Sequence, residues 1–129
     1  MSLYFAFWRE KENQEYPQPS EIYDAVFEEE TAEKLDLETL PHDKIVSDLK
    51  NTFKDWTIEG DDSSQLDFVS KDLSKSVIAG WMGNVYFTQC AYTLTNYEIN
   101  SIFDVFNKYG CAVYDIQTGE RFQQPEPTA

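Results

Sequence analysis

The sequence predicts a single α+β domain in which a mostly antiparallel sheet carries helices on one face. The length of 129 residues suits one domain. Hydrophobic residues make up 41% of the chain and aromatic residues 16%, which favours a packed core over disorder. Strand-like runs and amphipathic stretches follow the order β-α-α-β-β-β-α-β, a variant of the ferredoxin-like layout. We assign residues 1–122 to this domain and expect residues 123–129 to form a flexible C-terminal tail.

The first half of the chain predicts one strand and two helices. The apolar, aromatic run at 3–8 is typical of a central strand. Ser20 is a good N-cap for a helix that extends to about Glu30 and carries an i, i+4 apolar pair. A second helix is predicted at 41–53 by one apolar stripe, which consists of Ile45, Leu49, Phe53 and Trp56.

The second half predicts a three-stranded meander, a third helix and a last strand. Residues 60–64 have the composition of a turn. The runs that predict the meander alternate or are rich in β-branched and aromatic residues: 65–70, 76–82 and 85–91. Thr95 and Glu98 have the spacing of a capping box. The helix after them should bury an apolar face that consists of Ile99, Ile102, Phe103 and Phe106, and a buried strand is predicted at 111–114.

The charge of the chain is strongly negative and unevenly distributed. With 24 acids and 10 basic residues, the formal net charge is −14. Residues 10–62 hold 17 of the acids and five lysines, which leaves only −2 for the rest of the chain. Such a molecule repels phosphate backbones and anionic lipid, so we expect no nucleic-acid partner and no membrane. We expect a basic protein partner instead.

Five acids within the acidic segment are predicted to form the partner-binding face. Glu28, Glu29 and Glu30 stand at the end of the predicted first helix, where acids oppose the helix dipole. Asp61 and Asp62 follow in the predicted turn. Any one of these acids alone is typical of an ordinary solvated surface. As a set, they include three acids at a helix end that disfavours negative charge, without a structural gain. This indicates a function for the set.

Residue types that carry catalysis are scarce in this chain. His42 is the only histidine, and we expect it to be exposed at the start of a helix. Cys90 and Cys111 lie in apolar strands without the spacing of a zinc site, which predicts two buried free thiols. A disulfide is the alternative if the protein is exported. We therefore expect no enzyme activity, no metal and no cofactor. The N-terminus lacks the pattern of a secretory signal, which predicts a cytoplasmic location.

The two ends of the chain together resemble a group of small bacterial proteins. Residues 110–122 read GCAVYDIQTGERF, and the group pairs a GC-x-x-YD-x-QTGERF ending with an aromatic N-terminal strand like 3–8. Its members resemble immunity proteins of polymorphic or contact-dependent toxin systems, which are small, often acidic α+β proteins that bind one cognate toxin. The resemblance covers about a quarter of the chain and implies no catalytic residues. The residues of the ending themselves favour a turn that stabilises the fold.

The leading hypothesis is a non-enzymatic immunity protein. It would bind a cognate bacterial toxin, a nuclease, through an acidic surface that covers the toxin's basic groove. One alternative is a phage-type inhibitor of a nucleic-acid-binding host protein, which would use the same charge. The other is a small-molecule-binding or enzymatic α+β domain with a pocket near Trp81 and Tyr86.

Overall fold

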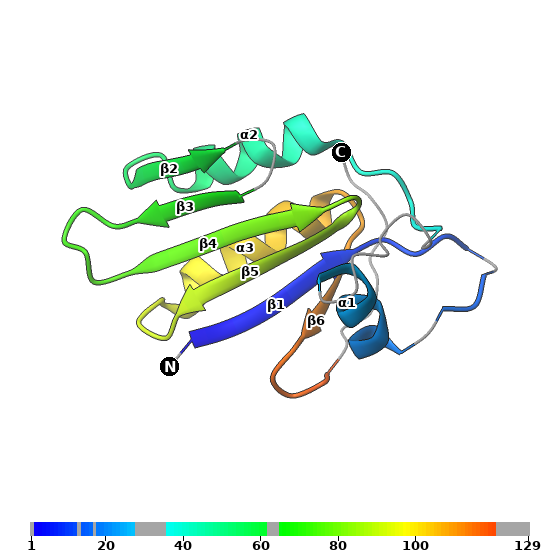
Figure 1. Cartoon of the computed structure of the whole chain (residues 1–129). Helices are drawn as coiled ribbons and strands as arrows, with labels where there is room; N and C mark the ends of the chain where they lie inside the picture. Colours follow the sequence, from blue (N-terminus) through cyan, green and yellow to red (C-terminus); the bar gives the residue numbers. More distant parts are fainter. Residues whose placement is uncertain (1, 13, 17, 28–35, 62–64, 121–129) are drawn as a thin grey trace.

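The computed structural model describes residues 2–12, 14–16, 18–27, 36–61 and 65–120. Six strands and three helices succeed one another along this part of the chain (Figure 1). The strands are β1 (Ser2–Trp8), β2 (Thr57–Asp61), β3 (Gln65–Val69), β4 (Ser76–Met82), β5 (Val85–Ala91) and β6 (Ala112–Asp115). The helices are α1 (Pro19–Phe27), α2 (His42–Thr52) and α3 (Asn96–Lys108).

The strands form one antiparallel sheet in the spatial order β2-β3-β4-β5-β1-β6. The four strands β4-β5-β1-β6, together with α2 and α3, have the ferredoxin-like arrangement. The β2–β3 hairpin extends the sheet beyond β4. The predicted α+β class with an antiparallel sheet is therefore confirmed, and the element order agrees apart from one additional strand.

That additional strand is β2, which the sequence analysis did not predict. Its five residues read TIEGD, and only Ile58 packs against the core while the other four are exposed. An edge strand of this kind is held by backbone pairing with β3, so it needs no alternating apolar pattern. The predicted turn at 60–64 is consequently wrong for residues 60 and 61, which belong to β2, and residues 62–64 lie outside the described residues.

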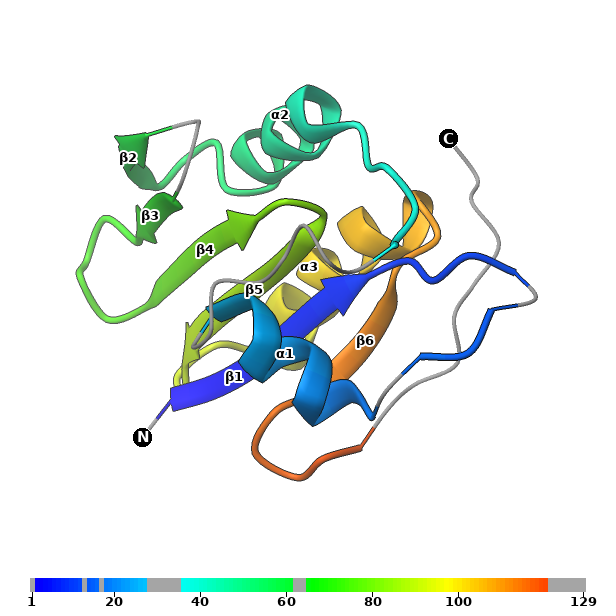
Figure 2. The ribbon, with the colours of Figure 1, turned by 45° about the vertical axis from the view of Figure 1, so that its right-hand side comes forward.

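The helices cover both faces of the sheet. Phe5 and Phe7 pack in a cluster with α2 and α3, whereas Ala6 and Trp8 pack in a second cluster with α1. Figure 2 shows α1 in front of β1 and α3 behind the sheet. The expectation of helices on one face holds for α2 and α3 only. Because successive side chains of a strand point to opposite faces, the continuous apolar run of β1 needs cover on both sides.

Helix α3 forms as predicted, with a shifted buried face. The backbone N–H of Glu98 donates to Thr95 Oγ1 at 3.1 Å, and that of Thr95 donates to Glu98 Oε1 at 2.8 Å, which completes the capping box. Of the predicted apolar face, Ile102 and Phe106 are fully buried, whereas Ile99 and Phe103 are only partly buried. Val105 is buried as well, because α2 packs beside α3 and covers that side of the helix.

The C-terminal motif at 110–122 is described as far as residue 120, and this part forms a turn that joins β6 to β1. Asp115 Oδ1 accepts hydrogen bonds from the backbone N–H groups of Gln117 and Thr118, at 3.0 and 3.2 Å. The Gln117 side chain then donates to the backbone carbonyl of Ser2 at 2.6 Å. These contacts agree with the fold-stabilising interpretation of the motif. Residues 121 and 122 lie outside the described residues.

Candidate protein-interaction site

Of the five acids predicted to bind a partner, the structure describes only Asp61. It is the exposed last residue of β2, and its Cα lies opposite that of Gln65 in β3. Glu28, Glu29, Glu30 and Asp62 lie outside the described residues. The acidic face therefore stays a prediction at these four positions.

The β2–β3 hairpin concentrates acid at the edge of the sheet. Glu59 of β2 and Asp67 of β3 are directly opposite each other, on the face that points away from α2 and α3. Between residues 56 and 70 the chain contains no Lys or Arg. Like charges directly opposite each other destabilise a pair of strands. The hairpin thus keeps a pair of like charges on this face, and the Gln65 side chain donates a hydrogen bond to Asp67 Oδ1 at 3.2 Å.

The helix layer differs, because an acid of α2 pairs with a lysine of α3 there. Lys108 Nζ of α3 is 3.2 Å from Asp48 Oδ2 of α2, and the Tyr109 hydroxyl donates to the same oxygen. These hydrogen bonds, that of Tyr109 first, hold the pKa of Asp48 below its ordinary value despite partial burial. Burial and Asp48 together raise the pKa of Tyr109 to about 12. Together α2 and α3 hold four acids and three lysines, a net charge of −1, so most of the acidic excess lies elsewhere.

The single histidine packs against core side chains and is not fully exposed. His42 starts α2 as predicted, but it is partly buried and its Nδ1 lies 2.8 Å from the Tyr86 hydroxyl. Its ring centroid is 4.6 Å from that of Trp81. Burial raises the pKa of Tyr86, whose side chain is 1% exposed, so the phenol stays protonated. No local pattern could have indicated this contact, because it joins residues 44 positions apart.

Both cysteines are free and buried, as the sequence predicted. Burial raises the pKa of Cys90 to about 11 and that of Cys111 to about 12. The thiols therefore stay protonated, and a protonated thiol is a poor nucleophile and metal ligand. Among the residues that the structure describes, no three His, Cys, Asp or Glu side chains are grouped as a metal site requires. No helix in the described ranges has both the length and the apolar character needed to cross a membrane.

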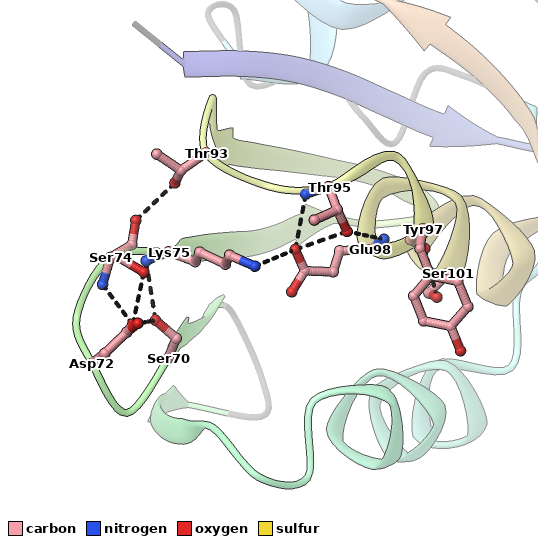
Figure 3. A network of polar contacts seen from close by, with 9 residues as sticks. All are labelled: Ser70, Asp72, Ser74, Lys75, Thr93, Thr95, Tyr97, Glu98 and Ser101. Atoms are coloured by element: carbon pink, nitrogen blue, oxygen red, sulfur yellow. Dashed lines mark hydrogen bonds and ion pairs between the residues drawn. The ribbon is translucent and has the colours of Figure 1, made fainter.

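The turn between β3 and β4 is held by one carboxylate. Asp72 Oδ1 accepts hydrogen bonds from the Ser70 hydroxyl at 2.8 Å, the Ser74 hydroxyl at 2.7 Å and the Ser74 backbone N–H at 3.0 Å (Figure 3). The backbone N–H of Lys75 donates to the Ser70 hydroxyl at 3.0 Å. Because both serines are fixed to a charged acceptor, the turn is held in one conformation.

Two further hydrogen bonds connect this turn to the start of α3. The Thr93 hydroxyl donates to the backbone carbonyl of Ser74 at 2.7 Å, and Lys75 Nζ donates to Glu98 Oε1 at 2.9 Å (Figure 3). Burial opposes the ionisation of Glu98, but hydrogen bonds from Thr95 and Lys75 outweigh it and lower its pKa. The turn at 70–75, the segment 92–95 and the first turn of α3 therefore form one connected unit, which we call the loop end.

Three large apolar side chains of the loop end are exposed to solvent. Leu73 is 79% exposed, Tyr92 67% and Tyr97 80%, and they are the exposed large hydrophobic residues of the described chain. One exposed apolar residue is ordinary, but three on mutually hydrogen-bonded segments indicate an interaction surface. Leu73 also has φ of 64°, a left-handed conformation that is unfavourable for residues other than glycine. Strain of this kind is often associated with function.

The Asp72 carboxyl should titrate far below an ordinary aspartate. Hydrogen bonds from the side chain and backbone of Ser74, and then from Ser70, lower its pKa from 3.8 to about 2. A lowered pKa means that the turn is stabilised above the unfolded pKa and loses this stabilisation as the pH falls from about 4 to about 2. Carbon-detected NMR titration should show the low pKa in the wild type. In Ser74→Ala it should move back toward 3.8, and an unchanged value would contradict the assigned hydrogen bonds.

Leu73→Gly should stabilise the protein slightly. Glycine removes the left-handed penalty, about 1–2 kcal/mol. Its greater freedom in the unfolded chain costs about 0.5–1 kcal/mol in return. The exposed side chain contributes little burial, so urea denaturation should show a gain of about 0.5 kcal/mol. Leu73→Ala is the control, because it shortens the side chain but keeps the strain. A loss of more than 1 kcal/mol in Leu73→Gly would show that the leucine packs on the fold.

No family model and no curated protein matches this chain. The sequence predicted the capping box of Thr95 and Glu98, but not the exposed surface of the loop end. No local pattern indicates that Leu73, Tyr92 and Tyr97 share one end of the molecule, because tertiary contacts bring their segments together.

Proposed function

We propose that this chain is a non-enzymatic immunity protein that binds and neutralises a cognate bacterial toxin, a nuclease, through an acidic surface. The observation that carries the proposal is the separation of charge. Four acids and three lysines are present in α2 and α3, a net charge of −1, whereas the β2–β3 hairpin carries Glu59, Asp61 and Asp67 without a basic residue. A nuclease groove must attract phosphates, so it is basic and complementary to such a surface.

The rigid loop end supports a protein partner over a small-molecule ligand. Its apolar side chains project from the molecule instead of lining a deep cavity, as hot-spot residues of protein interfaces do. The Tyr86 hydroxyl, which the alternative of a small-molecule or enzymatic pocket would use, is buried and hydrogen-bonded to His42. Two free, buried thiols are compatible with action in the cytoplasm, where cysteines stay reduced.

Co-expression with the product of the adjacent gene tests the proposal. We expect the two proteins to co-purify as a stoichiometric complex in which the partner's cleavage of DNA or RNA is abolished. The rate of association should fall as salt rises, because the attraction between the acidic and basic surfaces is screened. A partner that cleaves nucleic acid equally well with and without this protein would refute the proposal. A neighbouring phage operon without a toxin gene would favour the phage-type inhibitor.

A further inference from the structure

We infer that the loop end is the anchoring surface for the basic partner, with Leu73, Tyr92 and Tyr97 inserted into apolar depressions of that partner. This inference rests on the proposed function and assigns it a second surface. β2 starts at this end of the sheet with Thr57 opposite Val69, and Asp61 is at its far end. The loop end is therefore separate from the acidic tip of the hairpin, where the sequence placed the binding face.

The surface of the loop end has hollows that suit contact with another protein. A hollow of about 270 Å³ lies beside Tyr97 and is bounded by Trp56 and the Lys75–Glu98 pair. A second hollow, of about 360 Å³, lies under the turn and is lined by Asp55, Trp56 and Asp72 together with Lys71 and Lys75. Tyr97 thus projects beside one of the two hollows. Because hydrogen bonds already hold the three segments in place, binding would require little further ordering of their backbone.

Charge determines which partner fits this surface. Two copies of a chain with net charge −14 repel each other, which disfavours a homodimer through the loop end. The second hollow is lined by the acids Asp55, Asp72 and Glu98 against Lys71 and Lys75, so one acid is in excess there, beside the indole of Trp56. The occupant is therefore a basic protein whose apolar depressions are bordered by cations.

The exposed side of the β4–β5 hairpin is the competing surface. Ile78 and Gln89 lie opposite each other there, between Asp67 and Tyr4. Its largest apolar side chain already packs on the sheet, because the Phe87 ring occupies the space above Gly80: a Cβ there would lie 2.2 Å from the ring. Ile78 and Phe87 are half-buried, unlike the three residues of the loop end. This face thus offers a partner less new apolar burial.

Dissociation kinetics with the co-expressed product of the adjacent gene test the inference. The variant combines Leu73→Gly, Tyr92→Ser and Tyr97→Ser, and Ile78→Thr is the control on the competing face. We expect the triple variant to dissociate at least about 30-fold faster, because hot-spot side chains contribute mainly to the lifetime of a complex. Its association rate and salt dependence should stay close to those of the wild type. Circular dichroism and urea denaturation should show that it folds as the wild type does.

Each outcome decides a different question. A dissociation rate within threefold of wild type, in a folded triple variant, would overturn the loop end as the anchor and leave the proposed function intact. Faster dissociation in Ile78→Thr alone would assign binding to the β4–β5 face. Failure of the wild type to bind the adjacent product would overturn the proposed function and the inference together. A concentration-dependent dimer that the triple variant abolishes would identify a second copy as the occupant and refute the basic partner.

Discussion

Phe106→Ala is expected to lower the free energy of unfolding by about 3–5 kcal/mol. The Phe106 side chain is fully buried and stacks on Phe7 of β1, with ring centroids 3.9 Å apart and an interplanar angle of 10°. It also contacts the Tyr86 ring, at 5.4 Å between centroids. Truncation would leave a cavity between α3 and the centre of the sheet. Urea denaturation followed by circular dichroism measures the loss.

Phe103→Ala is the matched comparison, because it makes the same change one turn earlier in α3. The Phe103 ring meets Phe5 edge to face at 4.9 Å, but it is only partly buried. Its truncation should therefore cost less, about 1.5–3 kcal/mol. Equal losses in the two variants would show that the shift of the buried face of α3 toward Val105 is wrong.

Reversal of the five predicted acids to lysine is expected to slow association with the partner by about 10- to 1,000-fold. The changes are Glu28→Lys, Glu29→Lys, Glu30→Lys, Asp61→Lys and Asp62→Lys, and they shift the net charge from −14 to −4. Charges of this kind steer the encounter over a Debye length, which is about 30 Å at low salt and 8 Å at physiological salt. The wild-type association rate should fall as salt is added, and the variant should lose most of this dependence. Stopped-flow mixing at several salt concentrations measures both.

A control variant separates local steering from total charge. It makes the same change in net charge at five other exposed acids, which are Glu12, Glu15, Asp24, Asp104 and Glu120. If the two variants lose equal association rate, only the total charge matters. If the variant with the five predicted acids reversed associates like the wild type and keeps its salt dependence, those acids only keep the protein soluble.

Local chemistry was enough to predict most elements of the fold. The aromatic run of β1, the capping box of Thr95 and Glu98 and the apolar face of α3 each depend on contacts within a few residues or on a simple period. Two features were missed because neighbouring elements create them. β2 exists through its pairing with β3, and α1 crosses to the opposite face because β1 is apolar on both sides.

The sequence by itself determined the acidic character of this protein, its α+β class and the buried state of its two cysteines. Composition and periodicity are properties of the chain before it folds. Only the tertiary structure decided that His42 contacts Tyr86 and that a turn at 70–75 is hydrogen-bonded to α3. It also decided that Leu73, Tyr92 and Tyr97 share one rigid end. The physical reason is that the exposure and rigidity of a surface residue depend on which segments, distant in the sequence, come into contact. Sheet pairing brings together segments that lie about 20 or more residues apart in the chain.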